Sequence, residues 1–279
     1  RLFEQVFNRF GLKTLWIDFT KSNFQEVIAK HNPSMIWIES PTNPLLKIID
    51  IEEICNFSNK MQIPVVVDNT FATPLLQRPL KLGATLSLTS TTKYINGHSD
   101  ALGGAVCTES SAWKDKLNFA QKALGLNPSP FDCWLITRGI KTLPLRLERQ
   151  IDNASKIANQ LANNPLIESV RYPFRNDHPQ CKLAKRQMAL GGAIVTATVN
   201  ASQEQTYSFC KNLHFFKMAE SLGGIESLVC HPATMTHASV PKETKLKIGI
   251  TDSLIRFSVG CENIEDLSAD LNQALGIIS

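Results

Sequence analysis

Two side chains in the first half of the chain have the types needed for chemistry on a carbonyl cofactor. Lys93 follows the hydroxyl-rich stretch 88–92 and precedes the turn 97–100. Asp68 ends an apolar run that begins at Val65. A desolvated lysine has a lowered pKa and forms imines readily, while a carboxylate can keep a ring nitrogen protonated. The pair therefore suits catalysis with pyridoxal 5'-phosphate, in which the cofactor stores the electrons.

Two hydroxyl side chains beside this lysine are candidate phosphate ligands. Ser90 and Thr92 are two positions apart, so on an extended backbone their side chains point to one side. The same Ser/Thr-rich stretch is also typical of local turn hydrogen bonds. The spacing alone leaves both interpretations open.

Further polar residues are candidates for substrate contacts. Asn43 lies in a Pro-Thr-Asn-Pro turn, where asparagine is common for backbone reasons alone. Arg256 interrupts an apolar strand pattern, so its guanidinium must find a carboxylate, either on a substrate or on a neighbouring acid. His231 and His237 are six positions apart on a predicted loop, which favours a structural role, and no metal site is predicted.

The elements that must position these residues follow from apolar runs that alternate with helical patterns. Strands apolar on both faces and separated by helices predict a mainly parallel sheet covered by helices. The predicted strands are 14–19, 35–40, 64–71, 86–90 and 103–108, and the predicted helices are 23–30, 50–61 and 79–82. Ligands bind at the carboxyl ends of such strands. The residues expected to converge there are Asn43, Asp68, Thr70, Ser90, Thr92 and Lys93.

The pattern changes near residue 130. Long amphipathic helices are predicted over 131–163, and the remainder reads as a smaller α+β unit. Its predicted strands are 192–199 and 255–259, and its predicted helices are 202–213 and 262–275. We therefore expect residues 1–137 to be part of a large domain and residues 138–279 to form a smaller C-terminal domain.

Composition excludes several classes of protein. The 279 residues are 43% hydrophobic and 19% charged, which is ordinary for a globular protein. The net charge of +4 is scattered, and the densest basic cluster, 182–186, lacks the aromatics of a nucleic-acid site. No apolar run approaches the roughly 20 residues of a membrane span. Seven cysteines without a Cys-x-x-Cys pair indicate reduced thiols in a cytoplasmic protein.

Several longer motifs carry a resemblance to a known family. They are Glu39-Ser-Pro-Thr-Asn-Pro44, Val67-Asp-Asn-Thr-Phe71, Ser90-Thr-Thr-Lys-Tyr94 with Gly97-His-Ser-Asp100, Ala219-Glu-Ser-Leu-Gly-Gly224, Met235-Thr-His-Ala-Ser239 and Leu254-Ile-Arg256. In this order they resemble the Cys/Met-metabolism family of pyridoxal-phosphate enzymes, and within it the cystathionine γ-lyase and γ-synthase branch. The resemblance implies an α/β fold of the aspartate-aminotransferase type (fold type I) and a homotetramer built from catalytic dimers.

The resemblance also implies which residues hold the cofactor. Lys93 would carry the cofactor and shuttle a proton between substrate carbons. Asp68 would pair with the ring nitrogen, and Thr70 would lie near it and the ring oxygen. Ser90 and Thr92 would bind the phosphate.

A second set of residues is implied to contact the substrate. Asn43, Ser221 and Arg256 would hold the region of the α-carboxylate. Glu220 and Arg1 match positions that contact the distal part of the substrate. The implied reaction is transsulfuration at the γ-carbon of cystathionine or an O-acylhomoserine. Lyase and synthase activities stay unseparated, and β-lyase or homoserine sulfhydrylase activity also falls within the resemblance.

At its N-terminus the chain departs from the family pattern. Segments that the family places before Arg1, including a Tyr-x-Arg segment for the neighbouring subunit's phosphate, are absent. The apolar spacing of residues 2–10 predicts a helix without a cap, so the chain reads as a fragment. We expect weak cofactor binding by residues 1–279 alone. The alternative hypothesis is a catalytically impaired remnant that serves as a folded or partner-binding subunit.

Overall fold

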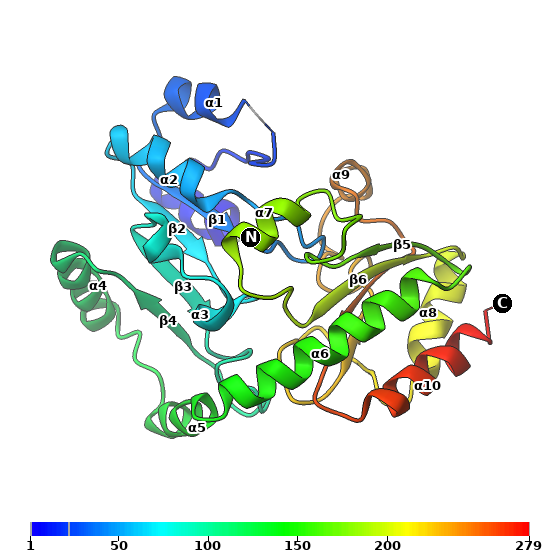
Figure 1. Cartoon of the computed structure of the whole chain (residues 1–279). Coiled ribbons are helices and arrows are strands. Elements are labelled where there is room, and N and C mark those ends of the chain that lie inside the picture. The colour runs from blue at the N-terminus through cyan, green and yellow to red at the C-terminus, as the bar shows by residue number, and fades with distance from the viewer. Residues whose placement is uncertain (1, 22, 279) are drawn as a thin grey trace.

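Two sheets organise the chain, one in each half (Figure 1). The structure is a computed structural model that describes residues 2–21 and 23–278. The first sheet has the order β1-β2-β3-β4, and the second has the order β5-β6-β9-β8-β7.

The first sheet is mainly parallel, as predicted. Strands β1 (Ile36–Glu39), β2 (Val65–Asp68) and β3 (Leu86–Ser90) are parallel, and β4 (Gly104–Cys107) joins β3 in antiparallel orientation. The three valines of β2 are buried, as expected for a central strand covered on both faces. The helices of this half are α1 (Phe24–His31), α2 (Ile51–Lys60), α3 (Thr73–Leu76), the 3-10 helix Pro79–Leu82 and α4 (Ser111–Leu124).

The second sheet is antiparallel except for its last pair, β7 and β8. Its strands are β5 (Ile167–Arg171), β6 (Ile194–Val199), β7 (Lys217–Met218), β8 (Leu228–Cys230) and β9 (Leu254–Ser258). The helices are α5 (Pro130–Ile140), α6 (Leu143–Ala162), α7 (Cys181–Gln187), α8 (Gln203–Asn212), α9 (Lys242–Ile248) and α10 (Ile264–Leu275). Helix α6 packs on β5, β6 and α10, and its apolar face is buried there (Figure 1).

The largest apolar core connects the two halves. It contains α6 and the second sheet, together with Leu46, Phe71, Tyr94 and Ile95 from segments that follow strands of the first sheet. The carboxyl ends of the first sheet therefore pack against the second half of the chain. This packing is what brings residues distant in sequence to one place.

Some sequence-based expectations were wrong in detail. Residues 14–19 form no strand: they lie in a loop that ends in a turn, and Ile17 and Phe19 pack beside the core around Phe24. The predicted N-terminal helix is a π-helical turn, Leu2–Val6, followed by the 3-10 turn Phe7–Phe10. The domain boundary at residue 137 falls within α5 and stays a prediction.

Candidate active site

The three parallel strands of the first sheet end at one edge. In the register, Glu39 at the end of β1 lies beside Asp68 at the end of β2, and Asp68 lies beside Leu88 of β3. Ser90 ends β3, and the turn that follows carries Lys93. The alternation of strands and helices thus gathers polar side chains at the carboxyl edge, where α/β proteins bind ligands.

Thr70 fixes the carboxylate of Asp68. The Asp68 Oδ1 atom accepts a hydrogen bond from the Thr70 backbone N at 3.0 Å and another from the Thr70 hydroxyl at 2.6 Å. The same Thr70 Oγ1 accepts a bond from the backbone N of Ser90 at 2.9 Å. The Asp68 carboxylate is therefore oriented by a hydroxyl that is itself tied to the end of β3.

Lys93 lies in a helical turn directly after β3. Its backbone N donates to the Ser90 carbonyl at 3.2 Å, and its own carbonyl accepts from the Gly97 N at 2.8 Å. The half-buried Nζ donates to the Ser221 hydroxyl at 3.1 Å. Burial, and then the positive charge of Arg256, lower the pKa of Lys93. A lowered pKa increases the neutral, nucleophilic fraction of the amine.

Arg146 of α6 holds this turn through hydrogen bonds to its backbone. Its guanidinium donates to the carbonyl oxygens of Tyr94 at 3.0 Å, Ile95 at 3.3 Å and Gly139 at 2.9 Å. Gly97 is required here because its φ is +74° and a Cβ atom would lie 2.0 Å from the Arg146 Nη1 atom. Arg146 thus joins the turn that carries Lys93 to the junction between α5 and α6.

The two hydroxyls predicted to bind phosphate do not form the pattern expected from the sequence. Strand β3 ends at Ser90, so the alternation of an extended backbone does not reach Thr92. Thr92 lies in the following turn, where its hydroxyl accepts from the Gly103 N at 3.0 Å and donates to the Gly103 carbonyl at 3.3 Å. Ser90 and Thr92 are both half-buried. Their role as phosphate ligands stays a prediction.

Arg256 connects the second sheet to this edge. Its Nη1 donates to the Asn43 side-chain oxygen at 3.0 Å, and its Nη2 donates to the carbonyl oxygens of Glu220 and Ser221, both at 2.9 Å. Among the described residues no carboxylate forms an ion pair with this guanidinium, and its buried Nε has no partner. A buried cation without an anion is suited to a carboxylate on a substrate.

Glu220 and Arg1 were predicted to contact the distal part of the substrate. The side chain of Glu220 is exposed, and only its backbone carbonyl binds Arg256. Gly223, which follows this segment, approaches the backbone after Lys93 closely: its φ is +80° and a Cβ atom would lie 2.8 Å from the Tyr94 N. Arg1 lies outside the residues that the structure describes.

Glu39 belongs to this cluster and was missed from the sequence. Its Oε1 accepts a hydrogen bond from the backbone N of Asn43 at 2.9 Å. The available signal was an acidic residue that ends an apolar strand, which is the pattern that singled out Asp68. The sequence gives no sign that the register places the two carboxyls side by side.

The charged groups at this edge fit pyridoxal phosphate. Within residues 2–21 and 23–278, neither Lys93 nor Asp68 forms an ion pair. An amine with a lowered pKa, an unpaired carboxylate on the neighbouring strand and a guanidinium without an anion are the groups that this cofactor and an amino-acid substrate need. The fold and these groups are therefore those expected of a pyridoxal-phosphate enzyme.

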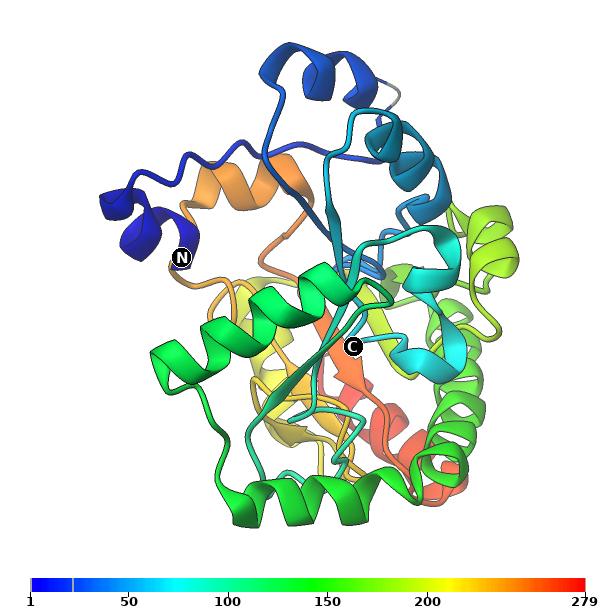
Figure 2. The same ribbon diagram turned by 90° about the vertical axis from the view of Figure 1, so that its left-hand side faces the viewer.

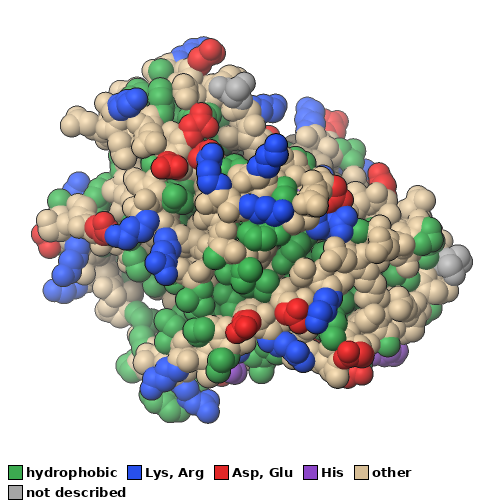
Figure 3. Space-filling model, viewed as in Figure 1, with side chains coloured by type: hydrophobic (Ala, Val, Ile, Leu, Met, Phe, Trp, Pro, Cys, Tyr) green, Lys and Arg blue, Asp and Glu red, His purple; other side chains and the backbone are tan. Residues whose placement is uncertain are grey.

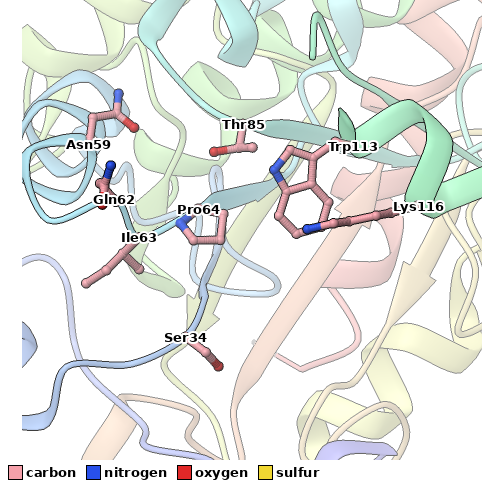
Figure 4. A pocket seen from close by; sticks show the side chains of 8 residues that line it. All are labelled: Ser34, Asn59, Gln62, Ile63, Pro64, Thr85, Trp113 and Lys116. Atoms are coloured by element: carbon pink, nitrogen blue, oxygen red, sulfur yellow. The ribbon is translucent and has the colours of Figure 1, made fainter. Parts of the chain in front are cut away.

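A cavity elsewhere in the first half is separate from this edge. About 500 Å³ in volume, it is lined by Ser34, Pro64 and Thr85, which precede β1, β2 and β3 respectively (Figure 4). Trp113 and Lys116 of α4 line it from the other side. Because it lies at the amino ends of the strands, it does not contain the candidate catalytic residues.

Comparisons with known proteins agree with this assignment. The profile of the family described as Cys/Met metabolism PLP-dependent enzyme matches residues 1–276, and the chain belongs to this family. The cystathionine gamma-lyase of Dictyostelium discoideum is 46% identical over 275 residues, which cover 99% of this chain and 71% of the relative. The cystathionine beta-lyase of Coxiella burnetii is 44% identical over 277 residues, which cover 99% and 72%.

A solved structure shows the same fold. The cystathionine gamma synthase from Xanthomonas oryzae pv. oryzae, in complex with aminoacrylate and cysteine, superimposes with a TM-score of 0.94. It is 40% identical, and the match covers 97% of this chain and 70% of that one. The aspartate-aminotransferase-like fold and the dependence on pyridoxal phosphate are thereby confirmed.

The described residues contain no candidate metal centre and no candidate membrane-spanning helix. No group of three or more His, Cys, Asp or Glu side chains in this part of the chain is placed to hold a metal ion. No helix within it combines the length and apolar character needed to cross a membrane.

Proposed function

We propose that the chain acts on sulfur-containing amino acids at the γ-carbon, with cystathionine or an O-acylhomoserine as substrate. The observation that carries this proposal is the cluster of Lys93, Asp68 and Arg256, three charged groups without ion-pair partners among the described residues. The names of the relatives, cystathionine gamma-lyase, beta-lyase and gamma synthase, indicate the substrate class.

Each residue has a distinct task in this proposal. When bound, the cofactor supplies an electron sink. Lys93 attaches the cofactor and moves protons to and from substrate carbons, and its contact with Ser221 sets the position of Nζ. Asp68 holds a proton at the ring nitrogen. Arg256, supported by Asn43, binds the substrate carboxylate.

The phosphate group is assigned to the hydroxyls at the end of β3. We propose that Ser90 and Thr92 bind it, with Thr70 lying close to the ring. Glu220 and Arg1 are proposed contacts for the distal part of the substrate. Ser90 and Thr92 bring no positive charge to a dianionic phosphate, so the cation that completes this set must come from another segment or subunit.

We expect the protein to cleave cystathionine with water to cysteine, 2-oxobutanoate and ammonia, or to make cystathionine from O-succinylhomoserine and cysteine with release of succinate. The holoenzyme is supplied with each substrate and the products are identified by mass spectrometry. Cleavage at the γ-carbon releases cysteine, whereas cleavage at the β-carbon releases homocysteine and pyruvate. Homocysteine with pyruvate as the sole products would assign the chain to the β-lyases instead, the activity for which the Coxiella burnetii relative is named.

Two other activities define the limits of this proposal. Sulfide incorporated into O-acylhomoserine would indicate a homoserine sulfhydrylase. Absence of turnover by a protein that binds the cofactor stoichiometrically would support the hypothesis of an impaired remnant. No comparison favours that remnant, since the relatives are named as enzymes.

We further propose that the protein is a cytoplasmic homotetramer. Strand β4 and helices α4 and α5 lie on one side of the molecule (Figure 2), and large apolar side chains on or next to them are exposed, as is visible around α5 (Figure 3). Leu102 and Phe119 are each 74% exposed, Phe131 64% and Trp134 59%. Exposed apolar surface gathered in one area is typical of a protein interface. The seven cysteines, none joined in a disulfide within the described residues, agree with a reducing compartment.

The purified protein is expected to sediment as a tetramer at micromolar concentration. Trp134→Glu should lower the assembly state because it places a charge within the apolar area. Tyr207→Glu serves as the control: this aromatic residue is also exposed but lies on α8, away from β4, α4 and α5. A wild-type protein that sediments as a monomer contradicts the proposal.

A further inference from the structure

Glu39 occupies a position between the cofactor side and the substrate side of the candidate site. Its neighbour in the strand register is Asp68, the proposed partner of the ring nitrogen. Its Oε1 accepts from the backbone N of Asn43 at 2.9 Å, and the side chain of Asn43 accepts from Arg256 at 3.0 Å. A single carboxyl group thus contacts the loop that supports the proposed carboxylate site and lies beside the cofactor carboxylate.

We propose that Glu39 is a positioning residue that couples the Asn43–Arg256 pair to Asp68 through its own state of protonation. This inference rests on the proposed function for the roles of Arg256 and Asp68. It adds a residue that touches neither the substrate nor the cofactor and acts through two residues that do.

Other hydrogen bonds hold most of the loop after β1, and the bond to Glu39 is the one made by the Asn43 N. The Ser40 carbonyl accepts from Gln77 at 2.7 Å and its hydroxyl accepts from the Ile49 N at 3.1 Å. The Thr42 hydroxyl accepts from the Lys47 N at 3.0 Å. These bonds hold the backbone on both sides of Asn43. The hydrogen bond that the Asn43 N donates to Glu39 fixes this nitrogen itself.

The electrostatic surroundings of Glu39 place its titration in the working pH range. Burial, and then the charge of Asp68 on β2, raise the pKa of Glu39 to about 7. The Asn43 N–H and the guanidinium of Arg256 on β9 oppose this rise. Burial lowers the pKa of Arg256, while Cys230, Tyr94, Glu220 and Glu39 itself oppose this shift. The pKa of Glu39 therefore depends on whether other charged groups bind to Asp68 and Arg256.

The direction of the coupling follows from these charges. A carboxylate bound to Arg256 competes with ionised Glu39 for the same positive charge, so it binds better when Glu39 is protonated. Affinity for a carboxylate is therefore expected to be higher below pH 7 and lower above it. By reciprocity, carboxylate binding raises the pKa of Glu39 and takes up a proton.

The first test measures this coupling without turnover. Butyrate has a carboxylate but no amino group, so it can occupy the Arg256 site without bonding to the cofactor. Its dissociation constant from the holoenzyme is measured between pH 6 and 8.5 from the change in cofactor absorption. We expect affinity to fall by about fivefold or more as pH rises. In Glu39→Gln, whose amide oxygen still accepts from the Asn43 N, this dependence should be lost.

Two further variants separate position from charge. Glu39→Ala removes the hydrogen bond to Asn43 and should weaken butyrate binding at every pH. Glu39→Gln should instead bind butyrate at every pH as tightly as the wild type does at low pH. Glu168→Gln is the matched control because Glu168 is exposed on β5 in the other sheet, and it should keep the wild-type dependence. If Glu39→Gln keeps that dependence as well, the proposal is overturned.

The second test is independent of the proposed function. Infrared difference spectra of the cofactor-free protein between pH 6 and 8 should show loss of a protonated carboxyl band in wild type and Glu168→Gln, but not in Glu39→Gln. Failure of butyrate to bind, with this band present, would argue against the role of Arg256 and not against the protonation of Glu39. Absence of the band from wild type would overturn the inference.

Discussion

Lys93→Ala is expected to abolish covalent attachment of the cofactor and to reduce turnover by at least about 10³-fold, the range in which general acid–base and nucleophilic groups contribute. The protein should stay folded. The side chain is half-buried and donates a hydrogen bond to Ser221. Burial lowers its pKa, so its removal also removes the cost of desolvating the amine. The change is chemical and leaves the anchors of the turn in place.

Borohydride reduction followed by peptide mapping measures this prediction. In the wild type the reduced cofactor should be found on the peptide that contains Lys93, and in Lys93→Ala no peptide should carry it. Lys182→Ala, which removes an exposed lysine of α7, should retain both label and turnover. Normal turnover by Lys93→Ala would refute the assignment of this lysine.

Asp68→Asn is expected to keep the cofactor on Lys93 while kcat falls about 10²- to 10³-fold. The amide oxygen can still accept the two hydrogen bonds that Thr70 donates to Oδ1, so the geometry survives. What is lost is the negative charge that holds a proton on the ring nitrogen. Loss of one charge-assisted interaction of this kind raises a barrier by on the order of 2 to 4 kcal/mol.

Steady-state kinetics and the same borohydride labelling distinguish this effect from loss of the cofactor. The expected outcome is full labelling of Lys93 with a strongly lowered kcat. Asp152→Asn, which breaks an exposed pair with Lys156 on α6, is the control and should leave kcat unchanged. A kcat within about twofold of the wild type would show that Asp68 does not serve the ring nitrogen.

The first sheet was predictable because its strands obey simple patterns. Strand β3 was predicted with its exact bounds, and β2 lies inside the predicted range because its valines are buried on both faces. Residues 14–19 have a similar apolar composition but no neighbouring strand to pair with. Helix α4 was not among the predicted helices, and none of its residues is buried in the fold.

The candidate site was predictable only in part. The strand-end rule identified Asp68 and Ser90 from local patterns. It could not place Arg256 against Asn43, since that contact depends on how the second half packs on the first. The resemblance to a family named that pair, whereas the role of Glu39 arises from the register of β1 with β2, which a single sequence does not encode visibly.

The division of the site between distant segments has a consequence for folding. The hydrogen bond between Lys93 and Ser221 spans 128 positions, and the one between Asn43 and Arg256 spans 213. Contacts of such sequence separation form slowly, because a long loop must close before they stabilise the chain. During synthesis, the first sheet can assemble on the ribosome while the carboxylate site still lacks its guanidinium. A nascent chain therefore acquires its complete set of candidate catalytic groups only after Arg256 has emerged.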